Sequence, residues 1–226
     1  MAPRDLAVAL VSGGMDSAVV AAQVCREHEP AFLHLDYGQR TEAKERACFE
    51  ALADHFHVER RLIARVDPLS RIGGSSLTEA SLPLAGAHQG PSRIPTTYVP
   101  FRNTHFLATA VSWGEVLGAR WIYYGAVEED SSGYPDCRAG YVQAFNRLVH
   151  QGTRPETRLE VVAPLLRLRK ADIVREGMRL GAPFHLTWSC YGESEKACGE
   201  CDSCLLRRKG FREAGVEDPI VYRKRG

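Results

Sequence analysis

Apolar segments and helix-patterned segments alternate through the first 64 residues of the chain. Continuous apolar runs occupy residues 6–11 and 31–35, and such runs are typical of strands buried on both faces of a parallel sheet. Residues 58–63 form a third predicted strand. Residues 17–27 and 41–56 are predicted helices, the second with a stripe of apolar side chains at helical spacing. This β-α-β-α-β order predicts an α/β fold with a doubly wound parallel sheet and right-handed crossovers.

The alternation is interrupted once and then resumes. Residues 65–100 hold 14 glycine, proline or serine residues out of 36, which predicts a long connection that is either functional or an ordinary surface excursion. Residues 128–138 form a second polar loop. The remaining pattern predicts, in order, helix 103–117, strand 120–124, helix 140–151, strand 159–163, helix 170–180 and helix 205–214. We expect one α/β domain over residues 1–186, followed by a small C-terminal segment over residues 187–226.

A glycine pair stands at the end of the first predicted strand, in the string Ser12-Gly13-Gly14-Met15-Asp16-Ser17. Because a helix follows, its free backbone N–H groups and its dipole favour an anion at this point, and the two serine hydroxyls can donate hydrogen bonds to the same oxygens. Ligands of open α/β sheets bind at this edge. The string lacks the lysine of the common NTPase loop and the Gly-x-Gly-x-x-Gly spacing of dinucleotide sites. We interpret it as a phosphate-binding loop of another type.

Four of the seven cysteines lie close together near the C-terminus, at Cys190, Cys198, Cys201 and Cys204. An odd number of cysteines with one dense cluster favours metal binding in a reduced compartment over a disulfide framework. Four thiolates close a tetrahedral zinc site with no open position, so such a zinc knuckle is structural. An iron–sulfur cluster is the alternative, although in ferredoxins the fourth cysteine follows the Cys-x2-Cys-x2-Cys run. Cys137 stands apart in a polar loop, where it is either a reactive thiol or a buried apolar residue.

Overall charge narrows the function classes. The chain of 226 residues carries a net charge of +1, so no global field favours nucleic acid or a membrane surface. No apolar stretch is long enough to span a bilayer, and no cleavage site follows the first apolar run. These features predict a soluble cytoplasmic protein that acts on small molecules and not on nucleic acid or a membrane.

The string Ser-Gly-Gly-x-Asp-Ser after an N-terminal strand resembles the pyrophosphatase loop of the N-type ATP pyrophosphatases, or PP-loop superfamily. The resemblance implies an adenine nucleotide alpha hydrolase-like fold that splits ATP between its α and β phosphates, with Mg²⁺ near Asp16. It also implies that ATP is bound by the loop and by residues after the second strand. The implied ATP-binding residues are Val11, Ser12, Gly13, Gly14, Met15, Asp16, Ser17, Ala18, Asp36, Tyr37, Gln39 and Arg40.

Five further strings, taken in order, resemble the 7-cyano-7-deazaguanine synthase family over residues 7–219. They are Asp36-Tyr37-Gly38-Gln39-Arg40, Ser75-Ser76-Leu77-Thr78, Ile94-Pro95-Thr96-Thr97-Tyr98-Val99-Pro100, Ser132-Gly133-Tyr134-Pro135-Asp136-Cys137-Arg138 and Ser189-Cys190-Tyr191. The resemblance implies an ATP-dependent ligase of queuosine precursor synthesis, working as a homodimer without nucleic acid. It would convert 7-carboxy-7-deazaguanine and ammonia to 7-cyano-7-deazaguanine through an adenylated acid and an adenylated amide.

The same resemblance suggests roles for particular side chains. Asp16, Ser17, Lys170 and Arg102 are the candidate catalytic residues, although Lys170 and Arg102 are also typical of solvated surface positions. The candidate substrate-binding residues are Arg102, Asn103, Asp130, Tyr134 and Asp136, with the two aspartates as acceptors for a guanine-like N–H edge. One residue departs from the family pattern, because Phe101 stands where a glycine is common. Two alternatives remain open: a tRNA-modifying adenylating enzyme, and a non-catalytic nucleotide-binding or zinc-ribbon module.

Overall fold

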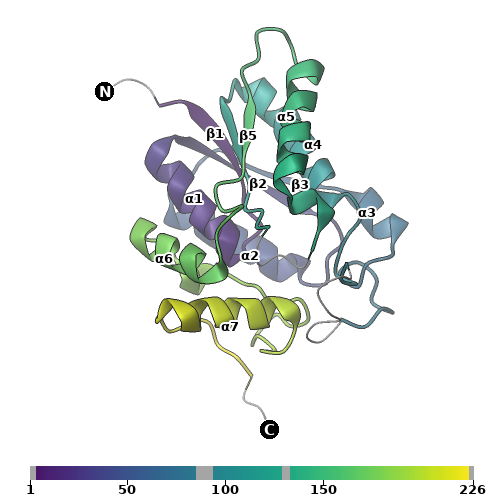
Figure 1. Cartoon of the computed structure of the whole chain (residues 1–226), viewed down its shortest axis with the longest axis vertical. Helices are drawn as coiled ribbons and strands as arrows, with labels where there is room; N and C mark the ends of the chain where they lie inside the picture. The colour runs from purple at the N-terminus through teal and green to yellow at the C-terminus, as the bar shows by residue number, and fades with distance from the viewer. Residues whose placement is uncertain (1–3, 85–93, 129–132, 224–226) are drawn as a thin grey trace.

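A parallel five-stranded sheet forms the centre of the computed structural model, which describes residues 4–84, 94–128 and 133–223 (Figure 1). Its strand order is β3-β2-β1-β4-β5, and every neighbouring pair is parallel. The strands are β1 (Leu6–Leu10), β2 (Glu29–Asp36), β3 (Arg61–Arg65), β4 (Trp121–Tyr123) and β5 (Glu160–Val162). The predicted doubly wound α/β fold is therefore confirmed.

Helices cover both faces of the sheet (Figure 1). They are α1 (Met15–Glu27), α2 (Glu42–His55), α3 (Asp67–Ile72), α4 (Arg102–Leu117), α5 (Ala139–Gly152), α6 (Lys170–Leu180) and α7 (Asp202–Ala214), with short 3₁₀ turns η1 (Pro135–Cys137) and η2 (Phe184–Leu186). Successive side chains of β1 point to opposite faces, as a strand requires. Ala7 and Ala9 join the core under α1, α2 and α6, whereas Val8 and Leu10 join the core under α3, α4 and α5.

The third strand lies later in the chain than its sequence pattern predicts. Residues 58–63 were the expected strand, but β3 runs from Arg61 to Arg65. Val58 is buried, and its backbone N–H donates to the carbonyl of Ala53 at the end of α2, while His57 takes a positive φ of 54°. Val58 is therefore buried because it packs at the C-terminal end of α2, and it is not part of the strand. Within residues 65–100, which carry no predicted element, α3 forms a short helix.

The topology places the ends of three strands at one point. β1 lies between β2 and β4, and the chain leaves β1 toward one face through α1 but enters β4 from the other face through α4. This reversal is the topological switch point at which open α/β sheets bind ligands. The glycine loop after β1, Tyr37 after β2 and Tyr124 after β4 all line the cavity described below.

The C-terminal segment packs on the domain through α7, which runs beside α6 (Figure 1). The approach is close, since a Cβ atom at Gly210 would lie 2.9 Å from the Cβ of Lys170. Arg207 of α7 is fully buried and forms an ion pair of 2.9 Å with Asp218, which ties the last residues to the same helix. None of the helices in the described ranges is long and apolar enough to cross a membrane.

Candidate active site

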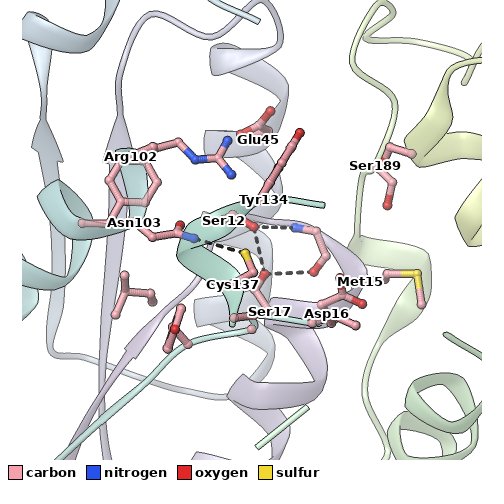
Figure 2. Close-up of a pocket in the computed structure, with 18 of the residues that line it drawn as sticks. Ser12, Met15, Asp16, Ser17, Glu45, Arg102, Asn103, Tyr134, Cys137 and Ser189 are labelled. Carbon is pink, nitrogen blue, oxygen red and sulfur yellow. Dashed lines mark hydrogen bonds between the residues drawn. The ribbon is translucent and has the colours of Figure 1, made fainter. Parts of the chain in front are cut away.

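The glycine loop is organised by its own serines (Figure 2). Ser17 Oγ donates to the carbonyl of Gly14 at 2.9 Å and lies 3.2 Å from Ser12 Oγ, and the Gly14 N–H donates to Ser12 Oγ at 3.3 Å. Gly13 has a φ of 87°, and a Cβ there would lie 2.6 Å from the carbonyl oxygen of Glu45, so only glycine fits. The first turn of α1 leaves backbone N–H groups without helical acceptors, and these can bind an anion.

Lys170 reaches the loop from the first position of α6. Its Nζ lies 2.6 Å from Asp16 Oδ2, and the Lys170 side chain is only 11% exposed. The other carboxylate oxygen, Asp16 Oδ1, is buried and has no hydrogen-bond partner among the described residues. A buried oxygen of this kind calls for a partner, and a hard cation or a ligand hydroxyl would supply one.

A cavity of about 300 Å³ extends from this loop. Arg102, at the first position of α4, lies in its wall and donates from Nη1 to the Tyr37 hydroxyl at 3.1 Å. The guanidinium carbon lies 5.5 Å from the ring centre of Tyr37, 5.7 Å from that of Phe106 and 6.0 Å from that of Tyr134. Cation–π attraction to these rings stabilises the charge. The cavity thus joins a phosphate-type loop to a cation surrounded by aromatic rings.

Glu45 of α2 enters the same cavity and is held by two hydrogen bonds. Thr41 Oγ1 donates to Oε1 at 2.7 Å, and Gln39 Nε2 donates to Oε2 at 3.2 Å. Burial raises the pKa of Glu45, and the donated hydrogen bonds and nearby His34 and Arg102 oppose that shift. Thr41 makes no side-chain cap to the α2 backbone; its hydroxyl donates to Glu45 instead.

Cys137 also lines the cavity. Its sulfur accepts a hydrogen bond of 3.3 Å from Asn103 Nδ2. Burial raises the pKa of Cys137 to about 11. The protonated thiol therefore dominates near neutral pH, and the thiolate needed for a nucleophile is disfavoured.

The four clustered cysteines form a candidate metal centre. Their sulfur atoms all lie within 4.8 Å of one another, and Cys198 Sγ is 3.9 Å from Cys204 Sγ. A tetrahedral zinc site with Zn–S bonds of about 2.3 Å has S–S edges of about 3.8 Å, so the spacing fits. Backbone N–H groups of Glu200 and Cys201 donate to Cys198 Sγ at 3.4 and 3.3 Å. Such bonds support a thiolate ligand.

Comparison with known proteins decides the family. A family model described as "Queuosine biosynthesis protein QueC" matches residues 6–215 of the chain. The chain belongs to the QueC family. It is 55% identical over 220 residues to the 7-cyano-7-deazaguanine synthase of Chlorobaculum tepidum, covering 97% of each chain. It is 53% identical over 226 residues to the enzyme of the same name from Acidobacterium capsulatum, covering 98% of each.

Likeness to solved structures is more distant. An NMN synthetase from Francisella tularensis aligns over 96% of this chain and 89% of its own, with 10% identity and a TM-score of 0.46.

Most of the residues expected at the site of this QueC-family chain do meet in the cavity. Those that line it are Val11, Ser12, Gly14, Met15, Asp16, Ser17, Tyr37, Arg102, Asn103, Tyr134 and Lys170. Gly13, in the loop, and Ala18, in α1, do not line the cavity. Asp130 lies outside the described residues. The structure thus assembles the glycine loop, Lys170 and Arg102 around one space, although their separate roles remain predictions.

Four expected residues serve the scaffold around the cavity. Asp36 is buried and lies 3.2 Å from His34 Nε2, and Gln39 accepts from the Tyr37 N–H and donates to Glu45. Arg40 turns away and donates to the carbonyls of residues 79, 80 and 82 in the long connection. Asp136 is 4% exposed, and its Oδ2 accepts from the Asn103 N–H at the start of α4. Its Oδ1 is buried with no hydrogen-bond partner among the described residues, and Asp136 is not among the residues that line the cavity.

Several residues of the cavity wall have no distinctive sequence pattern. Glu45 follows Thr41 by four positions and looks like an ordinary helix carboxylate. Tyr124 is buried with an unpartnered hydroxyl among the described residues. The C-terminal segment contributes Trp188, Ser189, Tyr191, Asp202, Ser203, Leu206 and Arg207. Of these residues, only Ser189 and Tyr191 belong to a string that the sequence had singled out, Ser189-Cys190-Tyr191.

Proposed function

We propose that this chain catalyses the ATP-dependent conversion of 7-carboxy-7-deazaguanine and ammonia to 7-cyano-7-deazaguanine. The observation that carries the proposal is the junction of the Ser12–Ser17 loop with the Arg102 end of one cavity, in a chain more than half identical to proteins of that name. The loop would bind the β and γ phosphates of ATP, which leaves the α-phosphorus open toward Arg102. Arg102 would hold the substrate carboxylate by charge-assisted hydrogen bonds.

The chemistry requires two activations, because a carboxylate oxygen and an amide oxygen are both poor leaving groups. In the first, the substrate carboxylate attacks the α-phosphorus, and pyrophosphate leaves. Ammonia then displaces AMP and forms the amide with loss of a proton. In the second, the amide oxygen attacks the α-phosphorus of another ATP and pyrophosphate leaves; loss of AMP and two protons from the adenylated amide then gives the nitrile. The protein contributes mainly positioning and charge stabilisation.

The residues at the loop fit the first task. Lys170 lies where it would stabilise the departing pyrophosphate, and Asp16 Oδ1 would hold Mg²⁺ together with the phosphates. Ser17 and the N–H groups of α1 would donate to the same oxygens. We assign the four cysteines to a structural zinc ion, because four thiolates leave no position open for substrate.

The remaining features of the proposal rest on the sequence pattern and, for the homodimer, on family membership. The α/β domain of residues 1–186 would carry the chemistry, and the zinc-binding segment of residues 187–226 would complete the cavity wall. The enzyme would act in the cytoplasm as a homodimer, on free ammonia and without nucleic acid.

The test is a reaction of the purified protein with ATP, ammonium and 7-carboxy-7-deazaguanine. We expect AMP and a product with the mass of the nitrile, and the amide as an intermediate at short times. Nucleotide turnover that depends on added tRNA would support a tRNA-modifying enzyme instead. No turnover with any of these substrates would contradict the proposal.

A further inference from the structure

The cavity brings a cation and a carboxylate close together without joining them in an ion pair. Three basic residues line it. Lys170 is paired with Asp16, and Arg207 with Asp218. Arg102 is different, since no described carboxylate oxygen lies within 4.0 Å of its guanidinium. Only one of its five side-chain N–H donors has a described acceptor, the Tyr37 hydroxyl.

Glu45 is the carboxylate that shares this part of the cavity. Figure 2 shows Glu45, Arg102 and Tyr134 reaching into the same space from three different segments. The charge of Arg102 is near enough to oppose the effect of burial on the pKa of Glu45. The other acids of the cavity wall lie elsewhere: Asp16 in the nucleotide loop and Asp202 in the first turn of α7.

A chain of hydrogen bonds fixes the two groups relative to each other. The Tyr37 hydroxyl accepts from Arg102, and the Tyr37 backbone N–H donates to Gln39 Oε1 at 2.9 Å. Gln39 in turn donates from Nε2 to Glu45. Each Glu45 oxygen thus accepts one described hydrogen bond and keeps a further lone pair for a ligand. The guanidinium and the carboxylate are therefore preorganised as neighbouring donor and acceptor surfaces.

We propose that Glu45 and Arg102 together read one edge of the deazapurine acid, with Glu45 as the residue that selects the 2-amino group. This inference rests on the proposed function. Along that edge the 7-carboxylate and the 6-oxo oxygen accept hydrogen bonds, and N1–H and the 2-amino group donate them. A guanidinium only donates, and an ionised carboxylate only accepts. The acceptor end of this edge therefore suits Arg102, and its donor end suits Glu45.

The surrounding rings fit a flat bicyclic ligand. Tyr37, Phe106 and Tyr134 surround Arg102 at 5.5 to 6.0 Å, which gives the ligand apolar faces for stacking. The sequence suggested this task for Asp136, but Glu45 lines the cavity and Asp136 does not. The adenine of ATP offers one amino donor beside a ring-nitrogen acceptor, so it would satisfy Glu45 less completely.

The experiment compares the natural acid with its analogue that lacks the 2-amino group. For the wild type we expect kcat/KM to favour the natural acid by roughly 10- to 100-fold, the effect of one hydrogen bond to a charged group. In Glu45→Gln this preference should fall to a few-fold, while the KM for ATP changes by less than about twofold. Glu50→Gln, on the same helix outside the cavity, is the matched control and should keep the wild-type preference.

The outcomes separate the two proposals. Failure of the wild type to convert the natural acid to the nitrile would overturn the proposed function. If the wild type converts it, equal use of both acids, or an undiminished preference in Glu45→Gln, would overturn the assignment of Glu45 alone. A matched rise in the KM values for ATP and for both acids would also overturn it, because Glu45 would then only support the scaffold.

Discussion

The backbone N–H of Trp188 donates a 2.8 Å hydrogen bond to the carbonyl of Gly13. Trp188 precedes Cys190 by two positions, and its indole N–H donates to the Glu193 carbonyl inside the cysteine segment at 2.8 Å. Lys44 lies over the same ring, 4.7 Å from its centre. Trp188 thus connects the four-cysteine centre to the glycine loop. If the cysteine segment became disordered, the glycine loop would lose this hydrogen bond to Trp188.

Loss of the metal is therefore expected to weaken nucleotide binding as well as the fold. In Cys198→Ser we expect metal content to fall to near zero and Tm to fall by roughly 10 °C, the effect of losing several kcal/mol in a chain of this size. The Kd for an ATP analogue, measured by calorimetry, should rise. Cys25→Ser, on α1 away from the cluster, should change neither the metal content nor the Kd for the ATP analogue. A metal-free variant with unchanged affinity for ATP would show that the knuckle and the loop are independent.

The Lys170–Asp16 pair predicts coupled effects on turnover. Lys170→Met should lower kcat by roughly 100-fold, as does the loss of one charged donor at a site of developing charge. Asp16→Asn should also lower kcat, and the double variant should be little worse than either single one, since either single change already breaks the ion pair that positions both groups. AMP release at saturating substrates measures these rates. Lys209→Met, at an exposed position of α7, is the control. Losses that multiply in the double variant would indicate separate roles.

The sequence predicted the order of elements well because the information was local. An apolar run followed by two glycines and a helix identifies β1, the loop and α1 without any knowledge of distant residues. The third strand was misplaced because the burial of Val58 has a non-strand cause, the end of α2. Hydrophobicity alone does not distinguish these two reasons for burial.

The site was less predictable because its residues come from distant segments. Glu45 and Arg102 are 57 positions apart, and only the packing of α2 against the loop and the start of α4 brings them into one cavity. Asp136 shows the converse case. Its residue type and loop position suggested ligand binding, but one of its carboxylate oxygens accepts from the backbone of α4 and Asp136 is not among the residues that line the cavity.

Phe101 predicts a stabilising substitution. Its φ of 61° lies in the left-handed region, and its side chain is 58% exposed, so it gains little burial for the strain. Left-handed backbone costs a non-glycine residue roughly 1 to 2 kcal/mol, and glycine costs about 0.5 to 1 kcal/mol in flexibility. Phe101→Gly should therefore raise Tm by roughly 1 to 4 °C in thermal unfolding. Phe101→Ala removes the ring but keeps the strain, so an equal gain in that variant would contradict the explanation.

Gly177 tests the packing of α6 on α1. A Cβ at this position would lie 2.2 Å from Phe184 Cζ and 2.8 Å from Val19 Cγ2, and all three residues are buried. Gly177→Ala should introduce strain of about 3 kcal/mol, which exceeds the gain of about 1 kcal/mol that alanine brings to a helix. We expect Tm to fall by roughly 4 to 8 °C. Gly152→Ala, with open space around its Cβ, should be neutral or stabilising, and a similar loss there would contradict the steric cause.

Glu45 predicts a stability difference that depends on pH. An unfolded glutamate ionises near pH 4.5, whereas burial raises the pKa of Glu45 in the folded chain. Above pH 4.5 the folded state therefore binds more protons at this site than the unfolded state, so its contribution to stability falls as pH rises toward the folded pKa. Glu45→Gln removes this penalty.

The Glu45→Gln variant should consequently melt at a higher temperature than the wild type near pH 7, and the two should converge as the pH falls below about 4.5. Thermal unfolding followed by circular dichroism across that range measures the difference, with Glu50→Gln as the surface control. A binding carboxylate kept at the expense of stability is the pattern expected of a functional residue. If Glu45→Gln were instead less stable at neutral pH, the ionised carboxylate would be holding the fold together through Thr41 and Gln39, and the penalty inferred from its burial would be wrong.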